Sequence, residues 1–92
     1  MRVRWTASAA ADLEGISNYL FEKTPQHAPR LCRAIYQAVA TLNTFPNRWR
    51  PGKKPGTREL VIPSLPYIVV YEASKDCVHV VRILHGAQQW PG

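Results

Sequence analysis

The chain has 92 residues, a length that predicts one domain, residues 1–92, built around a single modest hydrophobic core. Apolar residues make up 46% of the sequence and include three Trp, four Tyr and two Phe, which is the composition of a globular protein rather than a disordered one. The formal net charge of +6 favours a polyanionic or acidic partner, although a surplus that serves only solubility fits the same value.

The sequence also limits where the protein works and what it carries. No apolar run approaches the ~18 residues of a membrane span, and the N-terminus lacks the apolar stretch of a signal peptide, so we expect a cytoplasmic protein without a membrane partner. Cys32 and Cys77 are interpreted as buried thiols of a reducing compartment, with a single disulfide left open. We expect no metal and no cofactor, because metal-ligand spacings, a glycine-rich phosphate loop and a nucleophile elbow are all missing.

The first half of the chain predicts a short strand and two helices. Apolar residues alternate with arginines over residues 2–5, which indicates the strand. A helix over about residues 8–22 follows, capped by Thr6 or Ser8. A second helix begins near Ala28, takes a proline into its first turn, and ends at Phe45-Pro46. Because only a tight turn separates the two helices, they should pack as an antiparallel hairpin.

Residues 46–56 are rich in proline and glycine and are predicted to form no regular element. Positive side chains and one indole gather there, and no acid interrupts them. Such a loop suits phosphate contact with base stacking, and it suits an acidic protein surface equally well; a solvated loop without a partner is the alternative. The candidate residues for binding a target or nucleic acid are Arg48, Trp49, Arg50, Lys53, Lys54 and Arg58.

Three strand-like runs complete the chain, at Thr57–Ile62, Tyr67–Ala73 and Cys77–His85. The predicted order is therefore β-α-α-β-β-β. This order defines an α+β fold in which an antiparallel sheet is covered on one face by the helical hairpin.

Arg58, Arg82 and His85 are the candidate catalytic residues if the protein is a ribonuclease. His85 ends a strand and can act as a general acid or base, or can anchor the tail by a hydrogen bond. The arginines can stabilise a charged phosphorus centre. They can equally form ion pairs with one of three acids, Glu59, Glu72 or Asp76. Strand alternation places Arg82 and His85 on opposite faces unless a bulge intervenes.

Several stretches in a fixed order together resemble one known family, and they cover nearly the whole chain. They are Trp5, Ala10–Leu13 with Ile16, Leu42–Pro46, Gly56–Leu60, Leu65–Tyr71, Val80–Gly86 and Gln89–Pro91. In this order they resemble the ParE/RelE toxin superfamily of type II toxin–antitoxin systems. The resemblance implies the fold predicted above and a cognate antitoxin. With the positive charge it predicts an acidic, partly disordered antitoxin that folds onto the helical hairpin and an exposed sheet edge.

The resemblance implies one of two mechanisms. RelE-like members cut messenger RNA on the ribosome with lysines and arginines of the sheet, whereas ParE-like members poison DNA gyrase and lack that set. Here Ile68 stands where the ribonucleases carry an arginine, the stretch Gly86-Ala87-Gln88 lacks their further basic residue, and their two lysines fall near Glu59 and Val61. These departures favour a gyrase inhibitor that is not itself an enzyme. The alternatives are a ribosome-dependent endoribonuclease that uses His85, and a member that binds only its antitoxin.

Overall fold

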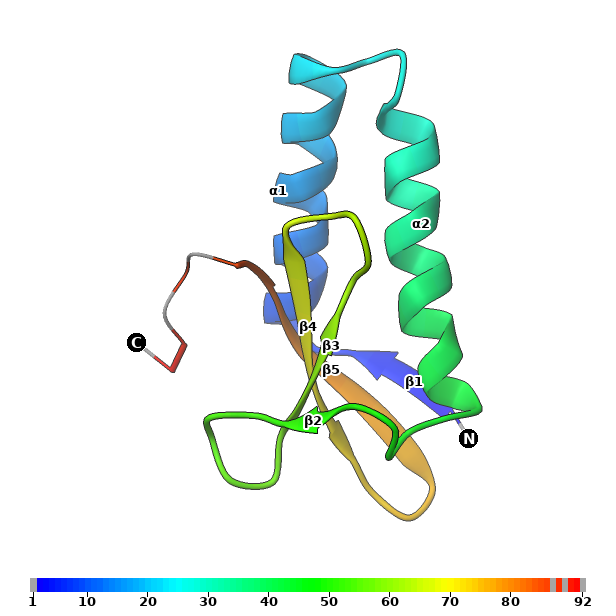
Figure 1. The fold of residues 1–92 in the computed structure, drawn as a ribbon, viewed down its shortest axis with the longest axis vertical. Helices are drawn as coiled ribbons and strands as arrows, with labels where there is room; N and C mark the ends of the chain where they lie inside the picture. The colour runs from blue at the N-terminus through cyan, green and yellow to red at the C-terminus, as the bar shows by residue number, and fades with distance from the viewer. Residues whose placement is uncertain (1, 87, 89, 92) are drawn as a thin grey trace.

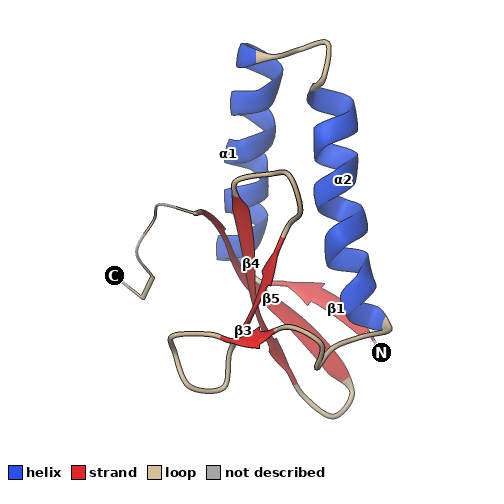
Figure 2. Cartoon of the chain, in the orientation of Figure 1, coloured by secondary structure: helices blue, strands red, loops and turns tan. Residues whose placement is uncertain are grey.

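The computed structural model describes residues 2–86, 88, 90 and 91. Two helices stand side by side against a twisted sheet (Figures 1 and 2). In chain order the elements are β1 (Arg2–Trp5), α1 (Ala7–Lys23), α2 (Ala28–Ala40), the 3-10 turn η1 (Thr41–Asn43), β2 (Arg50–Pro51), β3 (Arg58–Val61), β4 (Tyr67–Ala73) and β5 (Cys77–His85). Neither helix has the length and apolar character that crossing a membrane requires, as far as the described residues go.

The helix boundaries follow the predicted capping signals. The Thr6 side chain accepts a hydrogen bond from the backbone N–H of Ala9 at 3.1 Å, which satisfies one of the orphan donors of the first turn. Thr6 is therefore the cap, rather than Ser8. Helix α2 begins at Ala28 with proline in its first turn, as predicted, because a missing N–H is harmless there. Its predicted last turn is instead the separate 3-10 turn η1.

The sheet has five strands in the order β1-β5-β4-β3-β2, and β3, β4 and β5 form the predicted antiparallel meander. The expectation of a purely antiparallel sheet is wrong, because β1 pairs with β5 in the parallel sense. Parallel pairing needs a long crossover between the two strands, and here both helices and the strands β2, β3 and β4 lie between them along the chain. The α+β class is confirmed, with a mixed sheet.

The prediction that residues 46–56 contain no regular element is also wrong. Arg50 and Pro51 form the short strand β2, in which Arg50 lies opposite Glu59 and Pro51 opposite Arg58. Proline is tolerated there because β2 is the edge of the sheet, where no further strand needs its missing N–H.

The core lies between the helices and one face of the sheet. Alternate strand residues enter it, so that Val78 and Val80 of β5 are fully buried in one cluster with Ile35 of α2 and Leu42 of η1. The expectation of buried cysteines is wrong in part: both are free thiols, and both are only half-buried. Cys77 alternates with Val78 on β5 and therefore belongs to the face turned away from the helices.

Candidate functional site

The basic loop between Phe45 and Arg58 contains positive side chains of two kinds. Lys53 and Lys54 are exposed, and so is Arg48, whose guanidinium lies 5.4 Å from the ring centroids of both Phe45 and Trp49. Stacking on aromatic rings holds a guanidinium in place without removing its charge. All three cations are therefore exposed to a partner.

The other three candidates of the loop maintain its shape. Arg50 forms an ion pair with Glu59 across β2 and β3, with 3.0 Å between Nε and Oε1. Arg58 donates from Nη1 to the backbone carbonyl of Trp49 at 2.7 Å. Trp49 is half-buried against the core, and its indole Nε1 is a buried donor without a hydrogen-bond partner among the described residues. The indole is therefore not presented as a free stacking surface for a base.

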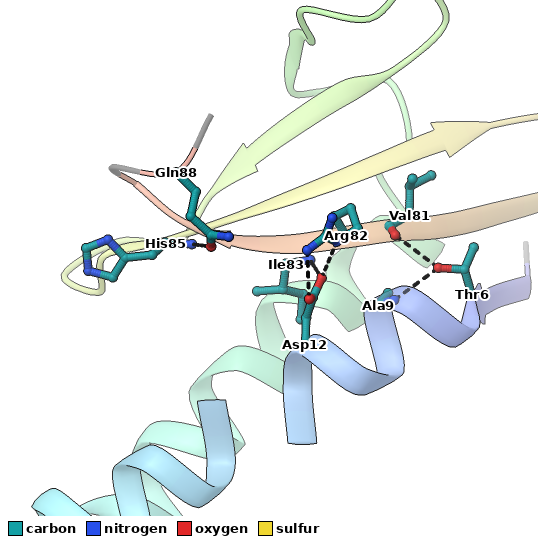
Figure 3. A network of polar contacts seen from close by, with 8 residues as sticks. All are labelled: Thr6, Ala9, Asp12, Val81, Arg82, Ile83, His85 and Gln88. Atoms are coloured by element: carbon teal, nitrogen blue, oxygen red, sulfur yellow. Dashed lines mark hydrogen bonds and ion pairs between the residues drawn. The ribbon is translucent and has the colours of Figure 1, made fainter. Parts of the chain in front are cut away.

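Asp12 of α1 is the residue that sequence reasoning missed. It accepts three hydrogen bonds: from Arg82 Nε at 2.7 Å, from Arg82 Nη2 at 3.0 Å and from the backbone N–H of Ile83 at 2.9 Å (Figure 3). The hydrogen bonds that Arg82 donates to Asp12 raise the pKa of Arg82 above its ordinary value, whereas burial lowers it. Arg82 thus pairs with Asp12 and not with Glu59, Glu72 or Asp76, the acids considered from the sequence.

Hydrogen bonds from Thr6 and to Asp12 cover the edge of β5 beyond the point where β1 ends. Thr6 donates from its backbone N–H to Val80 O and from its hydroxyl to Val81 O, each at 3.0 Å. Asp12 then accepts a hydrogen bond from the backbone N–H of Ile83, two residues further along β5. Exposed strand edges invite pairing with other chains, and side chains of α1 and its cap close this one (Figure 3).

The three candidate catalytic residues lie apart. Arg58 is paired with Tyr71 and His85 with Tyr67, positions that are about 13 Å apart along β4 at the usual strand rise. The register shift in β5 leaves Val81 without a partner in β4 and lies before Arg82, so it does not bring Arg82 and His85 together. His85 is exposed, and its ring meets the Tyr67 ring edge-on at 6.1 Å between centroids.

An apolar groove of about 590 Å³ lies between α1 and the end of the β4–β5 pair. Helix α1 contributes one wall, which includes Ile16 and the exposed side chain of Tyr19. Leu65 and Tyr67 contribute the opposite wall, and His85 stands at its margin. Such a groove fits the apolar face of a partner helix. Groups of three or more potential metal ligands do not occur in the described part of the chain.

This fold is shared with a solved chain from a toxin–antitoxin system. A solved chain titled "Chromosomal ParDE TA system from P. aeruginosa" superposes with a TM-score of 0.85 and 27% sequence identity, over 92% of this chain and 95% of that one. The fold thus defines the class as that of the small α+β toxins with RelE/ParE-like architecture.

Sequence comparison gives the family. A putative toxin, Y4kP, of Sinorhizobium fredii is 40% identical over 98% of this chain and 93% of its own length. Toxin RelE2 of Caulobacter vibrioides is 33% identical over 95% of this chain and 97% of its own. The family model described as "ParE toxin of type II toxin-antitoxin system, parDE" matches residues 3–90. The chain belongs to the ParE toxin family, and the predicted resemblance is confirmed.

Proposed function

We propose that this toxin arrests growth by binding and inhibiting DNA gyrase, without catalysing a reaction itself. The placement of the candidate catalytic residues carries the proposal. Arg82 is engaged by Asp12 in a structural ion pair, and Arg58 is bound to Trp49 O at the opposite end of β4 from His85. Phosphodiester cleavage needs its cationic groups gathered around one phosphate, and these groups are not gathered.

The contact with the target is made by the exposed cations of the basic loop. Arg48, Lys53 and Lys54 project from a segment that the Arg50–Glu59 ion pair fastens to the sheet. A loop that is already held in one conformation loses less conformational entropy on binding than a flexible loop does. Positive charge on such a surface also speeds the encounter with an acidic target.

Inhibition of supercoiling by purified gyrase tests the target and the surface together. The Lys53→Gln/Lys54→Gln variant loses two exposed charges of the loop, whereas Arg33→Gln/Lys75→Gln loses two exposed charges elsewhere. We expect the wild type and the second variant to inhibit equally. The loop variant should need about thirty times more protein, because each of the two lost charge-assisted contacts costs of the order of 1 kcal/mol. No inhibition by the wild type at stoichiometric excess would rule out gyrase as the target.

The cognate antitoxin binds across the apolar groove, as an acidic segment that folds into a helix on binding. The groove supports this proposal because it opens beside the exposed Tyr19, whereas the neighbouring edge of β5 is already closed by Thr6 and Asp12. Tyr19 and Tyr36 provide a matched pair for a test, since they are 57% and 56% exposed and only Tyr19 lines this groove. In co-purification from a two-gene plasmid, Tyr19→Glu should release the antitoxin and Tyr36→Glu should retain it. Equal retention by the two variants would exclude the groove.

A ribosome-dependent endoribonuclease is the alternative function, and the exposed position of His85 is the observation that favours it. The imidazole stands at the margin of the groove, where a proton could be exchanged with a substrate. Primer extension on messenger RNA after induction separates the two functions. New cleavage ends that disappear in His85→Ala would establish the ribonuclease; the gyrase proposal expects no new ends.

A further inference from the structure

Four chemically active side chains meet on the face of the sheet that is turned away from the helices. In the parallel pair of β1 and β5, Arg2 lies opposite Cys77 and Arg4 opposite His79. The residues between them, Val3 and Val78, pack into or against the core, so the four side chains emerge on the other face. The apolar groove meets β5 only toward its other end, at Ile83 and His85, and the basic loop lies between η1 and β3.

The thiol and the imidazole are in contact. Cys77 Sγ lies 3.8 Å from His79 Nε2 and 3.6 Å from Val78 O, and His79 is exposed. In the tautomer with a bare Nε2, this nitrogen can accept the thiol proton. The two arginines are exposed as well, and because neighbouring strands are only about 4.8 Å apart, their side chains leave the sheet beside those of Cys77 and His79.

We propose that Cys77 is a modification site that forms a mixed disulfide with an anionic small-molecule disulfide. Cys77 gives its proton to His79 Nε2, and the thiolate attacks one sulfur of the incoming disulfide. The S–S bond of that molecule breaks as a new S–S bond forms to Cys77, and the departing thiolate takes up the proton. Cys77 is oxidised and one sulfur of the disulfide is reduced, so the exchange balances. Arg2 and Arg4 bind the carboxylates of the reagent.

The surrounding charge selects this chemistry over the binding of a metal ion. Two guanidinium groups repel a cation and attract an anion. The carboxylate nearest to His79 in the register is that of Glu72 on β4, which leaves the arginine side of the cluster positive. Cys32 lacks such a setting, because its neighbours in the hollow between the helices include Trp5, Tyr36 and Ser17.

Intact-mass measurements on the folded protein test the proposal, with oxidised glutathione as the anionic reagent and 2-hydroxyethyl disulfide as the neutral one. Cys32→Ser isolates Cys77, and Cys77→Ser isolates Cys32. At low ionic strength Cys77 should react with oxidised glutathione about ten times faster than Cys32 does, because His79 accepts the thiol proton and the two arginines attract the anionic reagent. Equal rates at the two thiols would overturn the proposal.

Two further variants, made in the Cys32→Ser background, assign the roles. Arg2→Gln/Arg4→Gln should slow the reaction with oxidised glutathione about five-fold and leave the neutral reagent unaffected, since only the anion uses those charges. His79→Gln should slow both reagents. The matched control is Arg30→Gln/Arg33→Gln on α2, which should change neither rate. Unchanged selectivity in the β1 double variant would remove the arginines from the site.

Discussion

Asp12 holds α1 to β5, and its removal should be among the most destabilising single changes in this chain. In Asp12→Ala the backbone N–H of Ile83 loses its acceptor, and the Arg82 guanidinium loses two charge-assisted bonds. An orphaned backbone donor costs about 1–2 kcal/mol, and a half-buried charge without its partner costs a similar amount. Arg82 is 29% exposed and can recover some hydration, so we expect a total loss of about 3 kcal/mol.

Urea unfolding followed by circular dichroism measures this loss. In a chain this small the free energy of unfolding falls by about 1.2 kcal/mol per molar of urea, so the urea concentration at the unfolding midpoint should fall by about 2.5 M. Glu14→Ala, which removes an exposed acid from the same helix, should change stability by less than about 0.5 kcal/mol. Asp12→Asn keeps one acceptor for Ile83 and should cost about half as much as alanine. If Asp12→Ala lowers stability no more than Glu14→Ala does, the assigned role is refuted.

Other expected outcomes concern the cap, the core and the basic loop. Thr6→Ala removes both the helix cap and the bond to Val81 O, and calorimetry should show a loss of about 1–2 kcal/mol. Tyr71→Phe deletes the bond to Pro46 O, 2.7 Å long, at a cost of about 1 kcal/mol in urea unfolding. Burial raises the pKa of Tyr71 above its ordinary 10.0 despite the charge of Arg58, so stability is complete below pH 10 and falls as the pH rises toward the folded-state value; Tyr71→Phe should flatten that fall. At Gly52 an added Cβ would overlap the Thr57 hydroxyl, so Gly52→Ala should lower the thermal midpoint, whereas Gly15→Ala, which meets open space, should not.

Local signals in the sequence predicted most helices and strands, but they could not predict which strands pair with each other or in which direction. Threonine capping and strand alternation are decided within a few residues, and the resulting boundaries of β4 and β5 agree with the structure. The direction of β1 relative to β5 depends on where the chain returns to the sheet after the two helices, and the four residues of β1 do not encode that path. Strand β2 was missed because its proline, Pro51, argues against a strand anywhere except at an edge.

For the candidate site, too, the sequence predicted what lies close together along the chain and not what is brought together by folding. Clustering along the chain identified the basic loop. It could not tell Lys53 and Lys54 from Arg50, which pairs with Glu59, or from Arg58, which binds Trp49 O. The partner of Arg82 lies 70 residues away in Asp12, so only docking of α1 on the sheet reveals it. An acid placed beside the apolar residues Leu13 and Ile16 of a helix was the available signal, since a carboxylate near a buried stripe needs a partner.

The order in which cellular processes stop after expression without antitoxin tests the central claim most directly. Pulse labelling of DNA and protein synthesis, with a reporter of the DNA-damage response, resolves that order within minutes of induction. The account predicts that DNA synthesis falls and the damage response rises while translation continues. Immediate arrest of translation with DNA synthesis still running would contradict it and would place the target on the ribosome.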